Sequence, residues 1–173
     1  MHVLISLFVY IIYAATTIAC MLALIMSPQA MIDSGSALGL GHFYNLFNDE
    51  ITNYLRKLTS RQKPKAIVVC MIYFPDEVSG GGWAENVLSM LGYNSNPHKL
   101  QSIIRKVFEE AMCKISIEGT RVIPFPLFKV LDGKTSGYYT QRVEPSQLGG
   151  EQMGKAIIDA IVAADDGEVS RPL

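Results

Sequence analysis

One short run near the carboxyl end of the sequence combines residue types that could do chemistry: Glu144, Pro145 and Ser146, followed by a glycine-rich stretch. A carboxylate can act as the general base in acyl transfer, which also needs a nucleophile and oxyanion donors within hydrogen-bond reach. Beside a helix amino terminus, the same carboxylate would instead stabilise the helix by about 0.3–1 kcal/mol. Small residues at 156–164 predict such a helix. Glu144 is therefore either a candidate base or a structural acid, and Ser146 is a candidate helix cap.

Two other places in the chain could supply reactive or ligand-binding groups. Ser34, which follows Asp33, is a candidate nucleophile, and an ordinary polar loop is the alternative. Three consecutive glycines at 80–82 could cradle a phosphate, but no Gly-Lys-Ser/Thr follows them, so the P-loop spacing is absent. We therefore expect a flexible turn that lets Trp83, the single tryptophan, fold back as a hydrophobic plug.

The composition does not indicate a metal, an organic cofactor or a nucleic-acid partner. Cys20, Cys70 and Cys113 lie in apolar runs without paired spacing, which predicts buried free thiols. The three histidines are equally scattered. A formal net charge of −1 gives no support for phosphate-backbone recognition, which calls for a basic patch. We expect no metal, no cofactor and no nucleic-acid binding.

Apolar periodicity from residue 43 onward predicts the elements that position these groups. With 173 residues, 49% of them hydrophobic and 18% charged, the chain is long enough for one domain with a sizeable core. The apolar run at 66–74 predicts a parallel strand buried on both faces. Asn96 as cap and Pro97 as first residue predict the start of a helix. The expected series is a helix at 43–58, a strand at 66–74, a helix at 97–112, a strand at 120–125, a loop at 126–137 and a final helix whose Ile157, Ile158 and Ile161 face the sheet.

Alternating helices and strands predict a parallel α/β sheet with right-handed crossovers. In such sheets ligands bind beyond the carboxyl ends of the strands. The loops after Phe74 and Phe125, and the approach to Glu144, should therefore gather at one edge of the sheet. We expect Pro124 to lie near an end of the second strand's hydrogen bonding, because proline lacks the N–H that a ladder uses.

The block around Glu144 resembles the last conserved block of the SGNH/GDSL esterase–lipase family, which reads Asp-x-x-His-Pro-Ser-x-x-Gly. Gln141 stands at the position of the aspartate and Glu144 at that of the histidine, while the Pro-Ser pair and the glycine match. The resemblance implies a flavodoxin-like three-layer α/β/α domain with a parallel sheet over about 43–163, incomplete at the amino terminus. It also implies hydrolysis of a small ester through an acyl-enzyme, without a metal or an organic cofactor.

The other SGNH blocks have no clear match, so we expect an esterase-like domain that is inactive or incomplete as given. Ser34 has an isoleucine where the family's nucleophile block has a glycine, and the blocks that donate to the oxyanion cannot be placed. Two alternatives from other classes stay open. One is a non-catalytic domain that binds a carbohydrate, an acyl ligand or a protein, and the other is a membrane-anchored interaction protein.

The amino-terminal segment supports two interpretations. Residues 3–26 carry no charged side chain and approach the roughly 20 apolar residues that span a bilayer, which predicts a membrane anchor or an uncleaved signal. Alternatively, residues 2–7 form a strand that remains from a longer SGNH-type fold. In both cases the chain divides into an apolar segment at 1–31, an SGNH-like α/β domain at 32–164 and a polar tail at 165–173. A genuine anchor would place the protein in a membrane or in the secretory pathway.

Overall fold

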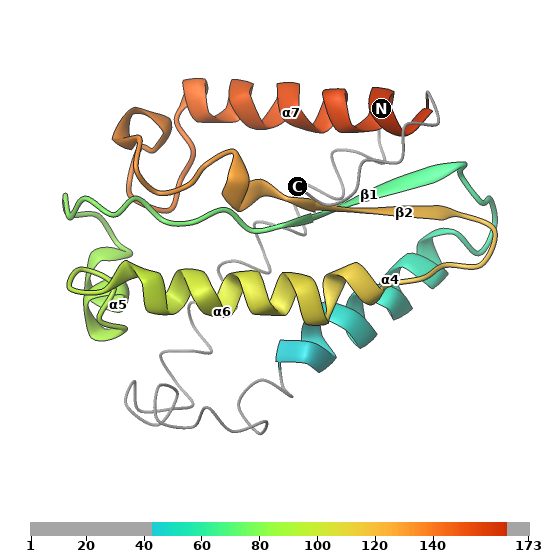
Figure 1. Cartoon of the computed structure of the whole chain (residues 1–173), viewed down its shortest axis with the longest axis horizontal. Coiled ribbons are helices and arrows are strands. Elements are labelled where there is room, and N and C mark those ends of the chain that lie inside the picture. Colours follow the sequence, from blue (N-terminus) through green and yellow to red (C-terminus); the bar gives the residue numbers. More distant parts are fainter. Residues whose placement is uncertain (1–42, 166–173) are drawn as a thin grey trace.

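Two parallel strands form the centre of the structure (Figure 1). The computed structural model describes residues 43–165. Strand β1 (Ala66–Met71) pairs in parallel with β2 (Arg121–Pro126), in a register that runs from Ala66 opposite Arg121 to Met71 opposite Pro126. The predicted parallel pairing is confirmed, and helix α6 (Pro97–Glu110) lies in the connection between the strands. The described part is a mixed α/β unit with a two-stranded parallel sheet.

Strand β1 is covered on both faces, as its continuous apolar run predicted. Val69 and Met71 lie in one buried cluster with residues of α6, which we call the α6 cluster. Cys70 lies in a second buried cluster with Met153 of helix α7 (Gln147–Asp165), which we call the α7 cluster. Each cluster fills one side of the sheet, so β1 separates two apolar layers.

The alternation of side chains changes phase where β1 ends. Met71 and Ile72 are adjacent in sequence, yet both pack in the α6 cluster. Tyr73 then packs against the α7 cluster, and Phe74 is buried in the α6 cluster. Because a regular strand sends adjacent side chains to opposite faces, the chain makes an irregular step between Met71 and Ile72. This step decides which face Tyr73 and Phe74 occupy beyond the end of the strand.

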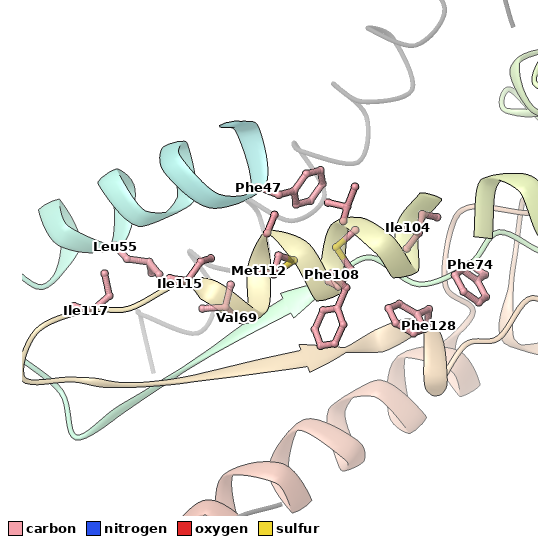
Figure 2. Close-up of a cluster of buried hydrophobic side chains, with 13 residues drawn as sticks. Phe47, Leu55, Val69, Phe74, Ile104, Phe108, Met112, Ile115, Ile117 and Phe128 are labelled. Atoms are coloured by element: carbon pink, nitrogen blue, oxygen red, sulfur yellow. The ribbon is translucent and has the colours of Figure 1, made fainter. Parts of the chain in front are cut away.

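An amphipathic helical segment lies beside α6 on the same side of the sheet (Figures 1 and 2). It begins with a π-helical stretch, η1 (Asn45–Glu50), and continues as helix α4 (Ile51–Leu58). Phe47 and Leu55 of this segment are buried in the α6 cluster. The helix predicted at 43–58 is therefore confirmed, and its first turns are wound as a π-helix, which periodicity alone does not reveal.

Helix α6 confirms the prediction of a helix at 97–112, with one change at each end. Pro97 is its first residue, as expected, but the side chain of Asn96 makes no capping hydrogen bond within the described residues. Beyond Glu110 the chain continues as the short 3-10 helix η2 (Met112–Lys114). The fixed backbone angle of Pro97 therefore specifies the start of α6, without a capping bond from the Asn96 side chain.

Helix α7 covers the side of the sheet opposite α6 (Figure 1). Met153 and Ile157, one helical turn apart, are buried against the sheet. The prediction that Ile158 and Ile161 also face the sheet is wrong, because they are 61% and 39% exposed. Ile158 is rotated by about 100° from Ile157 and therefore points outward. Ile161, four residues after Ile157, shares its helix face but packs in neither buried cluster.

The connections after both strands consist of short helical elements and irregular chain. They include α5 (Glu85–Met90) after β1, and η3 (Leu127–Lys129) and η4 (Ser136–Tyr138) after β2. Pro124 pairs opposite Val69 within the ladder, so the prediction that it lies near the end of β2 is wrong. The other edge of β2 is unpaired among residues 43–165. A proline N that faces that edge removes no ladder bond.

Of the cysteines in residues 43–165, Cys70 is buried and Cys113 is exposed, and both are free thiols. The prediction of burial is therefore wrong for Cys113. Cys20, Ser34, the apolar segment at 3–26 and the tail beyond 165 lie outside the described residues. Within that described part, no helix is both long enough and apolar enough to cross a membrane.

Candidate functional site

Glu144 lies in a narrow loop between β2 and α7, three residues before the first residue of α7. The loop closes on itself through an antiparallel bridge between Tyr139 and Pro145. Its two hydrogen bonds run from the Thr140 N–H to the Glu144 carbonyl and from the Ser146 N–H to the Tyr138 carbonyl, each at 2.8 Å. The placement of Glu144 and Ser146 at the start of the final helix therefore agrees with the expectation from the sequence.

Ser146 caps α7, and its hydroxyl both accepts and donates a hydrogen bond there. Its Oγ accepts a hydrogen bond from the Gly149 N–H at 3.1 Å, the geometry of a residue that precedes the helix by one position. The same hydroxyl donates to the Gly137 carbonyl at 2.6 Å. Gly149 packs directly on the Tyr138 carbonyl oxygen, where a side chain would overlap it. Ser146 is therefore a structural residue in this arrangement.

The side chain of Glu144 is held by Trp83, across 61 residues of sequence. Trp83 Nε1–H donates to Glu144 Oε1 at 2.9 Å, and the indole remains 49% exposed. The prediction that Trp83 folds back as a hydrophobic plug is thus wrong, because its polar N–H binds a carboxylate and its ring faces solvent. An exposed ring and a fixed carboxylate lie side by side at the carboxyl edge of the sheet.

Tyr73, two residues beyond the end of β1, holds the same loop through a hydrogen bond. Its hydroxyl donates to the Val143 carbonyl at 2.6 Å. Burial, and secondarily the negative charge of Glu144, raises the pKa of Tyr73, so this hydroxyl keeps its proton at all ordinary pH values. Tyr73 therefore acts as a hydrogen-bond donor that positions the residue beside Glu144.

Arg142 is the most heavily bonded residue of the site, and sequence reasoning missed it. Its side chain is 2% exposed and its backbone lies in the left-handed region, with φ of +63°. Nε and Nη2 donate to the Asp76 carbonyl at 3.2 and 3.0 Å, and Nη1 donates to Glu85 Oε2 and Asn94 Oδ1, each at 2.7 Å. Hydrogen bonds from Asn94 and then from Arg142 lower the pKa of Glu85. Arg142 thereby ties three separate segments together.

The chain beyond β1 is held on several sides at once. Asp76 N–H donates to the Arg142 carbonyl at 2.7 Å, and Asp76 Oδ1 accepts from the Val78 N–H at 2.9 Å and from Ser136 Oγ at 3.0 Å. The buried Tyr93 hydroxyl donates to the Pro75 carbonyl at 2.7 Å. Desolvation by burial raises the pKa of Tyr93 to about 12, so it stays a donor. These bonds fix the backbone at residues 75–78, which precedes Trp83 in the chain.

The described residues do not assemble a nucleophile with its base. Glu144 is paired with an indole, and the Ser146 hydroxyl is committed to backbone groups. The other candidate nucleophile, Ser34, lies outside residues 43–165. No group of histidine, cysteine or acidic side chains in those residues is placed to hold a metal ion. What the site offers is an aromatic face and a carboxylate on a rigid backbone.

Comparison of the chain with known protein families, with curated proteins and with solved structures finds no match.

Proposed function

We propose that the chain is an SGNH-hydrolase-type, esterase-like domain that binds a carbohydrate or an acyl ligand at the carboxyl edge of its sheet and does not hydrolyse esters. The order of parts supports the family. β2, a loop, Glu144 with Pro145 and Ser146, Gly149 and the last helix follow one another as the resemblance requires. Helices on both sides of the parallel sheet are consistent with a flavodoxin-like three-layer domain.

The hydrogen bond between Trp83 and Glu144 carries the functional part of the proposal. In acyl transfer, the base at this position must take a proton from a nucleophile within hydrogen-bond distance. Glu144 is instead fixed by a donor, and the remaining carboxylate oxygen is an acceptor for ligand hydroxyls. The exposed indole ring supplies an apolar face beside that acceptor. A few polar groups beside an aromatic surface are typical of small-molecule sites.

The absence of hydrolysis is tested with short-chain nitrophenyl esters. We expect a rate no higher than that of a protein with ordinary surface serines, because losing even one oxyanion donor costs about 10²–10³ in rate. Glu144→His should restore the family's residue type without restoring activity. Saturable turnover that Ser34→Ala abolishes, or esterase activity gained by Glu144→His alone, would contradict the proposal.

Ligand binding is tested separately through the fluorescence of Trp83, the single tryptophan of the chain. We expect cellotetraose or triacetin to change the emission saturably, and Glu144→Gln to weaken that binding several-fold because it removes the charge of the acceptor. Glu151→Gln is the matched control, since Glu151 is an exposed acid on α7 that accepts from Gln147 and does not contact Trp83. If neither compound changes the emission, or if both variants behave alike, the site does not bind in this way.

A further inference from the structure

An open pocket of about 840 Å³ lies beyond the ends of both strands. Phe74 and Phe128 line it from the segments that follow β1 and β2, and Phe108 lines it from α6. Tyr73, which supports the Glu144 loop, packs in the α7 cluster, whereas Phe74 packs in the α6 cluster. The lining of the pocket includes neither Trp83 nor Glu144, so the two sites share no residue.

Three phenylalanine rings form a rigid apolar floor in this pocket, and Figure 2 shows them grouped together. Phe74 and Phe128 stack with ring centroids 5.0 Å apart, and Phe108 meets Phe128 edge-on at 5.6 Å. All three rings are buried in the core, so their orientations are fixed by packing. Each ring is at most 5% exposed, so only a small part of each borders the pocket, and a ligand would contact that part without ordering these side chains.

Three cationic side chains, Arg105, Lys129 and Lys134, line the rim above this floor. The Arg105 guanidinium lies over the Phe74 ring, 4.7 Å from its centroid, which fixes its position. None of the three forms an ion pair within residues 43–165. The carboxylates of Glu109 and Asp132 also line the pocket, which leaves an excess of one positive charge. The three cations and two carboxylates together therefore give the pocket lining a net positive charge.

We propose that this pocket binds a small organic anion that has an apolar body, with Arg105 as the main anion contact. A guanidinium presents a planar fork of donors that matches a carboxylate or a phosphate. The apolar body contacts the parts of the three phenylalanines that border the pocket, and the pocket volume is within the range of small-molecule sites. The inference is independent of the proposed function, because the Trp83–Glu144 site contributes nothing to it.

The proposal is tested by calorimetric titration of the full chain with 1-naphthyl phosphate, which combines a flat apolar ring system with an anion. We expect saturable binding that Arg105→Met weakens about tenfold, which corresponds to about 1.4 kcal/mol. Lys106→Met is the matched control, because Lys106 is the next residue on α6, is exposed and does not line the pocket. Equal effects of the two variants, or no binding by the wild-type chain, would overturn the proposal.

Two further measurements separate specific binding from general charge attraction. Removing a competing carboxylate with Glu109→Gln should tighten 1-naphthyl phosphate binding, the opposite sign to Arg105→Met. Neutral 1-naphthol and inorganic phosphate should each bind at least several-fold more weakly, since each lacks one of the two contacts. The proposal would be contradicted if inorganic phosphate bound as tightly as 1-naphthyl phosphate. It would also be contradicted if Glu109→Gln bound 1-naphthyl phosphate more weakly than the wild type.

Discussion

Ser146 uses its single hydroxyl in two directions, accepting from the Gly149 N–H and donating to the Gly137 carbonyl. We expect Ser146→Ala to lower the free energy of unfolding by about 0.5–2 kcal/mol, the usual loss for a helix cap. Urea unfolding measures the change. Ser102→Ala is the control, because Ser102 is exposed on α6 and makes no side-chain hydrogen bond within the described residues. If Ser146→Ala and the wild type unfold at the same urea concentration, Ser146 does not stabilise α7 as a cap.

We expect the two described cysteines to differ in reactivity, because they differ in burial. Burial raises the pKa of the Cys70 thiol to about 12, so at pH 8 roughly one such thiol in ten thousand is ionised. Cys113 is exposed, although partial desolvation and then the charge of Glu109 raise its pKa as well. We expect iodoacetamide at pH 8 to label Cys113 and to leave Cys70 unlabelled until urea is added, as read by peptide mass spectrometry. Rapid labelling of Cys70 in the native chain would show that β1 is less protected than its packing indicates.

At the scale of elements, the contact between α7 and the preceding loop depends on one glycine. A methyl group on Gly149 would overlap the Tyr138 carbonyl oxygen, whereas no atom lies within 4 Å of the corresponding position on Gly150. We expect Gly149→Ala to destabilise the fold by about 1–3 kcal/mol, as overpacking does. Gly150→Ala should instead stabilise it by about 0.4–1 kcal/mol, because alanine loses less backbone entropy in a helix. Thermal unfolding of the two variants compares them directly, and shifts of the same sign would refute this packing.

The elements themselves were largely predictable, because burial imposes a pattern on the sequence. The apolar run around Val69 and the spaced apolar residues of α6 indicated a buried strand and an amphipathic helix, and both are confirmed. Smaller departures from regular geometry leave no such pattern. The irregular step between Met71 and Ile72 and the outward position of Ile158 depend on how neighbouring elements pack.

At the scale of the whole molecule, Arg142 joins segments that no short-range pattern connects. Its loss would leave the buried Asp76 carbonyl without its donors. We expect Arg142→Met to lower the free energy of unfolding by about 1–3 kcal/mol, the cost of an unsatisfied buried acceptor. Glu85→Gln should change it less, because glutamine keeps one acceptor oxygen for Arg142 and the Asp76 carbonyl keeps its donors. Urea unfolding distinguishes the two, and a comparable loss in both variants would assign the stability to the ion pair instead.

The candidate site was predictable only in part. Contacts between residues close in sequence could be predicted, and contacts between distant residues could not. Glu144 and Ser146 could be placed because the loop, the cap and the helix follow one another within a few residues. The partners of Trp83 and Arg142 lie 48 to 66 residues away, and a hydrogen bond over that separation requires the folded chain. An isolated tryptophan next to glycines therefore suggested an apolar plug, although its N–H binds a carboxylate.

The bonds of Arg142 also set an order of assembly during synthesis. Asp76, Glu85 and Asn94 leave the ribosome well before Arg142, because the chain is made from its amino terminus and Arg142 follows them by 66, 57 and 48 residues. Until Arg142 emerges, the Asp76 carbonyl lacks the two side-chain donors that later bind it. The carboxyl edge of the sheet is therefore completed only when nearly the whole domain has been translated, and a nascent chain halted earlier would be open to proteases at the glycines that precede Trp83.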